Sequence, residues 1–191
     1  MYIKNLTKSF DNKVIFDKFS VEIKEFKVTY IMGESGCGKT TLLRILAGLD
    51  NDFTGEIPLL DSVSYVFQEP RLFPLLNVQK NIKIVNDTPV FSIQDVLKIV
   101  ELEKEELSLP HTLSGGMKMR VALARALYHN KDIYLMDEPF SALDEDMKNR
   151  ILPQLFSFFA LNKKTVIIVS HDLTEAEKYG DNIITLKNLK D

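Results

Sequence analysis

The sequence predicts an α/β fold in which a mostly parallel sheet is flanked by helices, and three observations lead to this class. Short apolar segments typical of strands alternate with longer segments of helical periodicity along most of the chain. A glycine-rich stretch, GESGCGKT at residues 33–40, joins one such strand directly to one such helix. The stretch 69–110 is rich in proline and begins with turn-forming residues, so we expect a small, mostly helical lobe inserted into the α/β core.

The expected elements follow in chain order. Short strands within residues 1–31 form an N-terminal antiparallel β subdomain, and a helix at 38–49 and a strand at 61–68 come next. Within the lobe, SIQDVLKIVELEKEEL predicts a helix at 92–107. The later elements are a helix at 114–130, a strand at 132–137, a helix at 145–161, a strand at 165–170, a helix from Leu173 and a strand at 182–187. Because Pro153 lies inside the helical segment at 145–161, we expect a kink or a late start there.

The composition is typical of a globular cytoplasmic protein. Hydrophobic residues make up 45% of the 191 residues, which allows a sizeable core, and we expect a single domain at 1–191. The net charge of −3 provides no basic patch, so we expect no nucleic-acid partner. No apolar run is long enough to span a membrane, and the N-terminus lacks the apolar core of a signal peptide. We therefore expect contact with a membrane only through a partner protein.

The glycine-rich stretch fits the phosphate-binding pattern G-x-x-x-x-G-K-[ST] at every fixed position. Glycines let the backbone curl so that successive N–H groups point at phosphate oxygens. Lys39 would reach the β- and γ-phosphates of ATP, and the Thr40 hydroxyl would bind Mg²⁺. A chance glycine loop is the alternative, but the flanking strand and helix favour a nucleotide site. The predicted nucleotide-binding residues of this stretch are Gly33, Glu34, Ser35, Gly36, Cys37, Gly38, Lys39, Thr40 and Thr41.

Cys37 is the single cysteine, which excludes an internal disulfide. The simpler interpretation of Cys37 is a small side chain at a variable position of the loop. Its place at a helix N-terminus favours the thiolate. We therefore expect alkylation of Cys37 to block ATP binding, and bound ATP to protect it.

Acidic and polar residues follow the later apolar strands. Asp137 ends one strand beside the phosphate loop and is suited to hold Mg²⁺, while Glu138 could polarise a water that attacks the γ-phosphate. An acidic turn after a buried strand is the alternative. His171 follows the next strand and could contact the γ-phosphate, although a lone histidine is usually structural. Gln68 ends an earlier strand and could reach the metal or the water.

A second anion site is indicated by LSGG at 113–116, where a helix begins. The hydroxyl of Ser114 and the bare backbone amides of Gly115 and Gly116 at a helix N-terminus suit a negatively charged group. The residues themselves do not show which anion would bind, because the phosphate loop lies far upstream.

Together these motifs resemble the nucleotide-binding domain of ABC transporters over essentially the whole chain. In chain order they are the phosphate loop at 33–40, Gln68, LSGG at 113–116, LMDEP at 135–139, SALD at 141–144 and His171. The resemblance implies a P-loop NTPase core from residues 1–68 and 111–191, with a helical subdomain at about 69–110 that extends into the signature helix. It also implies ATP hydrolysis with Mg²⁺ and stacking of Phe10 on adenine, a core or edge-strand phenylalanine being the alternative.

The resemblance gives LSGG a ligand. In this family two domains associate head to tail, and each ATP lies between the phosphate loop of one and the Ser-Gly-Gly of the other. Ser114, Gly115 and Gly116 would then contact the γ-phosphate bound by a second copy, and Asp144 would lie near that copy's phosphate loop. ATP would close the dimer and hydrolysis would reopen it.

Finer features resemble the ATPases of nitrate, sulfonate, taurine and thiamine-precursor importers. They are EPRLFPLLNVQKNI at 69–82, LSGGM at 113–117 and DEPFSALD at 137–144. The implied partners are integral membrane permease subunits, which would contact the lobe near Gln68 to Phe73, and a solute-binding protein. The implied location is cytoplasmic, peripheral on the inner face of the cell membrane. The sequence departs from the usual pattern of this family in two respects. The segment between Lys39 and Gln68 is short, which predicts a trimmed loop or hairpin, and we expect no regulatory tail.

Other functions stay open on the sequence. An exporter or a lipid- or lipoprotein-release system would use the same ATPase motifs. A soluble ABC protein of DNA repair or of ribosomes usually has two such domains or a coiled-coil insertion. A P-loop kinase or GTPase would have no use for LSGG.

Overall fold

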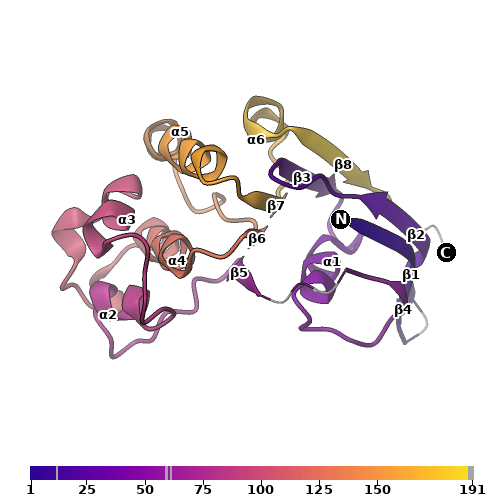
Figure 1. Cartoon of the computed structure of the whole chain (residues 1–191), viewed down its shortest axis with the longest axis horizontal. Helices are drawn as coiled ribbons and strands as arrows, with labels where there is room; N and C mark the ends of the chain where they lie inside the picture. Colours follow the sequence, from indigo (N-terminus) through magenta and orange to yellow (C-terminus); the bar gives the residue numbers. More distant parts are fainter. Residues whose placement is uncertain (12, 59, 61, 189–191) are drawn as a thin grey trace.

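The computed structural model describes residues 1–11, 13–58, 60 and 62–188, and their strands form two sheets (Figure 1). The strands are β1 (Tyr2–Phe10), β2 (Lys13–Glu22), β3 (Val28–Gly33), β4 (Thr54–Glu56), β5 (Val63–Val66), β6 (Ile133–Asp137), β7 (Thr165–Val169) and β8 (Asn182–Leu186). The larger sheet is parallel, with the order β5-β6-β7-β3-β8, and the smaller sheet is antiparallel, with the order β2-β1-β4. The predicted fold class is confirmed.

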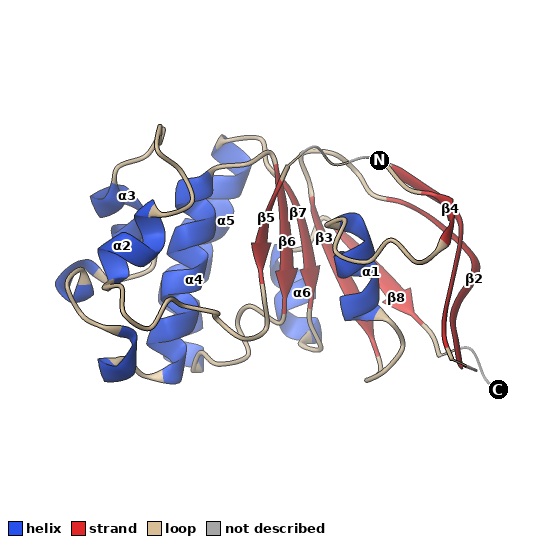
Figure 2. Cartoon of the chain, turned by 90° about the horizontal axis from the view of Figure 1, so that it is seen from below, coloured by secondary structure: helices blue, strands red, loops and turns tan. Residues whose placement is uncertain are grey.

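Helices occupy both faces of the parallel sheet and one of its ends. They are α1 (Lys39–Leu46), α2 (Val78–Lys83), α3 (Ile93–Ile99), α4 (Gly115–His129), α5 (Glu145–Leu161) and α6 (Leu173–Tyr179), with short 3-10 turns at Glu103–Glu105 and Pro110–Thr112. Figure 2 shows α2, α3 and α4 gathered beyond β5, while the antiparallel strands lie at the β8 end. None of the helices in the described part of the chain combines the length and the hydropathy needed to span a bilayer.

Side chains of the central strands alternate between two hydrophobic cores on opposite faces of the parallel sheet. On β6, Tyr134 and Met136 belong to the core shared with α4 and α5, whereas Leu135 belongs to the core shared with α1 and β1. The alternation follows from the two-residue period of a strand. Because both faces are covered, these strands are apolar along their whole length, which is the pattern that the sequence shows.

The helix predicted at 92–107 is wrong beyond Ile99, where α3 ends. Glu101 has a left-handed backbone, with φ of 52°. Nη1 of Arg120, on α4, donates hydrogen bonds to the carbonyl oxygens of Val100 (3.0 Å) and Glu101 (2.9 Å). Local propensity favours a continuous helix, but these carbonyls bond instead to a side chain from another element, and the chain turns.

Helix α5 runs without interruption through Pro153, so the expected late start is wrong. The side chain of Asp144 caps the helix by accepting a hydrogen bond from the backbone N–H of Met147 (2.8 Å), and Glu145 lies in the first turn, where acidic residues are favourable. Pro153 lies on the exposed side of the helix, where water can hydrate the carbonyl that loses its partner. Strand β4 was not predicted, since three residues are too few to show a period.

Leu123 offers a test of how strongly α4 joins the lobe to the sheet, because its side chain is completely buried. We expect Leu123→Ala to lower the free energy of unfolding by about 2–5 kcal/mol, since it leaves a cavity in the larger core. Urea denaturation followed by circular dichroism measures the change. Leu107→Ala is the control, because Leu107 is 75% exposed. Equal stability of the two variants would contradict the assignment of Leu123 to the core.

Candidate functional site

The phosphate loop connects β3 to α1 along a path that two glycines permit. Gly33 has φ of +146°, and a Cβ there would lie 2.5 Å from the carbonyl oxygen of Leu186. Gly38 has φ of +98° at the N-cap of α1, and a Cβ there would lie 2.5 Å from the Ile15 side chain. The pattern that the sequence shows is therefore required by the backbone conformation and by close neighbours.

The side chain of Lys39 turns back over this loop. Its Nζ donates hydrogen bonds to the carbonyl oxygens of Gly33 (2.7 Å) and Glu34 (2.9 Å). The ammonium group thus lies at the loop itself, where an anion bound by the backbone amides would meet it.

Asp137 ends β6 close to the start of α1. The Thr40 hydroxyl donates a hydrogen bond to Asp137 Oδ2 over 2.8 Å. Burial raises the pKa of Asp137 above its usual range, the hydrogen bond from Thr40 acts in the opposite direction, and the charge of Glu138 adds to the increase. A buried carboxylate in this environment would be stabilised by a cation.

Glu138 and His171 meet because β6 and β7 are parallel neighbours whose carboxyl ends coincide. The backbone N–H of Glu138 donates to the carbonyl of Val169 (2.9 Å), and Glu138 itself has a left-handed φ of 49°. Its Oε2 lies 2.9 Å from Nδ1 of His171. This unusual backbone at a short polar turn is typical of functional positions.

These groups surround a cavity of about 250 Å³. It is lined by Ile15, Ser35, Gly36, Gly38, Lys39, Thr40, Thr41, Gln68, Asp137, Glu138 and Val169. The structure therefore brings most of the predicted phosphate-loop residues together with Gln68 and both acidic residues, and His171 joins them through Glu138.

The predicted residues of the LSGG and SALD motifs lie outside the lining of this cavity and act locally as helix caps or at a helix start. The hydroxyl of Ser114 accepts a hydrogen bond from the N–H of Met117 (3.2 Å), which caps α4, and Asp144 caps α5. A Cβ on Gly116 would lie 2.9 Å from the carbonyl oxygen of Ala142, so the LSGG and SALD motifs are adjacent in one chain. Gly115 has open space around it, and nothing lies within 4 Å of its Cβ position.

Phe10 and Cys37 also differ from the rest of the predicted site. Phe10 ends β1, is 47% exposed and does not line the cavity. The side chain of Cys37 is only 3% exposed and packs into the core beneath α1. This burial supports the interpretation of Cys37 as a small side chain that fills space.

Two basic residues that the sequence reasoning missed hold segments beside the site. Arg125, on α4, donates to the carbonyl oxygens of Pro70 (2.9 Å) and Arg71 (3.1 Å), just after Gln68. Lys148, on α5, pairs with Glu145, Asp172 and Glu175, next to His171. Arg125 could have been noticed as a lone charge within the apolar run ALARAL. Lys148 carries no such signal, because its partners Asp172 and Glu175 lie more than twenty residues away along the chain.

Comparisons with known proteins agree with this arrangement. Residues 16–141 match the family model described as ABC transporter. The Fe(3+) ions import ATP-binding protein FbpC of Haemophilus influenzae is 35% identical over 98% of this chain, which spans 60% of that relative's length. The aliphatic sulfonates import ATP-binding protein SsuB of Bacillus cereus is 37% identical over 90% of this chain and 73% of its own.

Solved structures show the same fold. The dimeric structure of MJ0796, a bacterial ABC transporter cassette, superposes with a TM-score of 0.85 at 32% identity and covers 98% of this chain and 95% of its own. A post-hydrolysis state of MJ0796 bound to ADP and phosphate gives a TM-score of 0.83 at 31% identity, with the same coverage. The order of motifs, the cavity at the carboxyl edge of the sheet and these similarities lead to one conclusion. The chain belongs to the ABC transporter family, as an ATP-binding domain of that family.

Proposed function

We propose that this chain is the ATP-hydrolysing subunit of a membrane importer, and that it works by ATP-driven head-to-tail dimerisation. The observation that carries the proposal is the division of the predicted residues into two groups. The phosphate loop, Gln68, Asp137 and Glu138 share one cavity, whereas the Ser-Gly-Gly at the start of α4 lies outside it. A second copy of the chain would bring its own Ser-Gly-Gly to this cavity.

The phosphate loop would bind the polyphosphate of ATP through its amides and through Lys39. The ammonium of Lys39 would exchange its bonds to two carbonyl oxygens for bonds to the β- and γ-phosphates, which carry full negative charge.

Mg²⁺ fits the same place, because its preferred ligands are oxygens. The Thr40 hydroxyl and the buried Asp137 carboxylate lie 2.8 Å apart, and Gln68 lines the same cavity. Mg²⁺ usually takes one or two carboxylates with the rest of its shell from phosphates and water, so this small donor set is sufficient. When bound, the ion would neutralise charge on the phosphates during transfer.

Glu138 would act as the general base, taking a proton from the water that attacks the γ-phosphate. His171, in contact with the same carboxylate, would hold Glu138 in place and contact the γ-phosphate when ATP is bound. In the closed dimer Ser114 and the two glycines of one copy would contact the γ-phosphate of the other, and Asp144 would lie near its phosphate loop.

The proposed partners are integral membrane permease subunits and a solute-binding protein, with the chain cytoplasmic and peripheral on the inner face of the cell membrane. The permease contact would involve the start of the lobe (residues 69–110), where Leu75 is 90% exposed and Phe73 is 48% exposed. Leu72 is partly buried against the larger core, so it offers less apolar surface for docking. An exporter would present the same surface, so the identity of the permease separates these two functions.

We expect Glu138→Gln to bind ATP, to dimerise and to hydrolyse ATP about 100-fold or more slowly, because the general base is lost. Gel filtration with ATP measures the shift from monomer to dimer, and phosphate release measures turnover. Adding Gly115→Asp to this variant should remove the dimer and leave ATP binding by the monomer intact, since the Cβ position of Gly115 is open. Normal turnover of Glu138→Gln would refute the role of Glu138.

We expect Leu75→Asp to weaken association with the permease without changing ATP hydrolysis by the isolated chain. The reason is that a charge on this exposed apolar side chain would have to be desolvated at the interface. Co-purification with the co-expressed permease is the measurement. Leu161→Asp is the matched control, because Leu161 is 82% exposed at the end of α5 and is not part of residues 69–110. Equal loss in the two variants would argue against a contact at Leu75.

We expect iodoacetamide to label Cys37 slowly in the folded protein and more slowly again with Mg-ATP. The thiol is buried, so labelling requires the phosphate loop to open, and bound nucleotide would hold the loop closed. Mass spectrometry of the single cysteine gives the rate directly. The labelled protein should no longer bind ATP. Equal labelling rates with and without Mg-ATP would contradict the proposal that ATP binds at the phosphate loop.

A further inference from the structure

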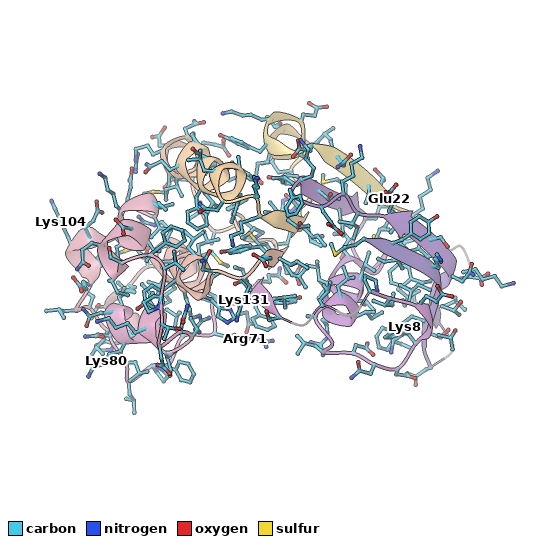
Figure 3. The ribbon with its side chains drawn as sticks, viewed as in Figure 1. Lys8, Glu22, Arg71, Lys80, Lys104 and Lys131 are labelled. Atoms are coloured by element: carbon cyan, nitrogen blue, oxygen red, sulfur yellow. The ribbon has the colours of Figure 1, made fainter. Side chains whose placement is uncertain are left out.

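Lys8 lies on β1 and is buried although it carries a charge. It is 3% exposed, and its ammonium group lies among oxygen atoms of the loop that follows α1. Nζ donates to Asp50 Oδ1 (2.9 Å), to the carbonyl oxygen of Asp52 (2.6 Å) and to Asp52 Oδ2 (3.3 Å). Figure 3 labels Lys8 at the end of the molecule formed by the antiparallel strands. A buried lysine requires such partners, and the Asp50 carboxylate is largely covered with it, whereas the Asp52 side chain is exposed.

The charge of Lys8 is retained in this position. Desolvation lowers the pKa of Lys8, but the hydrogen bonds to Asp50 and Asp52 outweigh it, and the pKa is raised above its usual value. A buried ion pair of this kind adds little stability compared with apolar residues that fill the same space. The hydrogen bonds to Asp50 and Asp52 nevertheless fix the position of the ammonium group.

The same ammonium group makes a second contact, with an aromatic ring. Lys8 Nζ lies over the ring of Phe10, 4.6 Å from its centroid. Residues two apart on a strand share a face, which is why the two side chains meet. The cation thus lies against the ring of Phe10, a residue that is still 47% exposed.

Phe10 lies at the end of the paired region of β1 and β2. The register shifts between Lys8 and Ser9, and Asp11 has a left-handed φ of 49°. Phe10 is the last residue of its strand, so without Lys8 its ring would have several rotamers available. Fixing the ring before binding removes an ordering cost at the moment of binding.

The exposed ring lies at the phosphate-loop end of the hairpin. Phe10 pairs with Lys13 across the turn, and Lys13 Nζ lies 3.9 Å from the Cβ position of Gly36. An aromatic ring beside a phosphate loop suits the base of the nucleotide whose phosphates the loop holds.

We propose that Lys8, anchored by Asp50 and Asp52, is a positioning residue that holds the Phe10 ring from one side so that its free face stacks on a purine base. The proposal rests on the nucleotide site described above. It assigns to the loop after α1 a part in recognising the base, since that loop anchors the lysine.

The test compares ATP with inorganic triphosphate, which has no base to stack. We expect Lys8→Met to weaken ATP binding by about fivefold or more and to leave triphosphate binding unchanged, as measured by calorimetry with Mg²⁺. Lys8→Arg should bind ATP nearly as the wild type, because it keeps a cation under the ring. Lys4→Met is the matched control, since Lys4 is an exposed lysine of the same strand and should change neither ligand.

A double-mutant cycle tests whether Lys8 acts through Phe10. Phe10→Ala should weaken the binding of ATP but not of triphosphate. Adding Lys8→Met to this variant should cause no further loss of ATP affinity. Lys8→Met with Asp50→Asn removes both charges and provides a stable variant if Lys8→Met unfolds. Additive losses, an equal loss of triphosphate binding, or undiminished ATP binding in the folded variants would each overturn the proposal. A wild-type chain that binds neither ligand would instead overturn the nucleotide site.

Discussion

The parallel pairing of β3, β6 and β7 is the constraint on which the rest of the site depends. Parallel strands end at one edge, so the residues that follow them meet there although they are far apart in sequence. The phosphate loop follows β3, Asp137 ends β6 with Glu138 next to it, and His171 follows β7. The pairing is itself secured by two cores, because each central strand places alternate side chains on opposite faces.

Two charged groups at this edge of the sheet, Lys39 and Asp137, lie where a charged ligand would stabilise them. Lys39 bonds to carbonyl oxygens of its own loop, and Asp137 is a buried carboxylate whose pKa is raised by burial. Phosphate would satisfy the first group and a cation the second, so a nucleotide with its metal would relieve both. The group that needs a phosphate and the group that needs a cation belong to the same chain.

The Ser-Gly-Gly motif is different, because its local role is already satisfied. Ser114 caps α4 and Asp144 caps α5, yet neither capping role requires two glycines after the serine. The backbone amides at this helix start remain available to an anion from outside the chain. In the proposed function, a fold that is complete as a monomer would carry half of a site that a second copy completes.

Sequence alone determined the fold class, the family of this protein and the order of its strands and helices apart from α2 and β4. It did so because these features depend on local patterns, such as the apolar runs of β6 and β7 and the spacing of glycines around Lys39. The tertiary structure decided the break of α3 before Glu101, the burial of Cys37 and the contact between His171 and Glu138. It also decided the partners of Arg125 and Lys8, which lie more than forty residues away. Such pairings join groups distant in sequence, and only the packing of whole elements brings them within hydrogen-bonding distance.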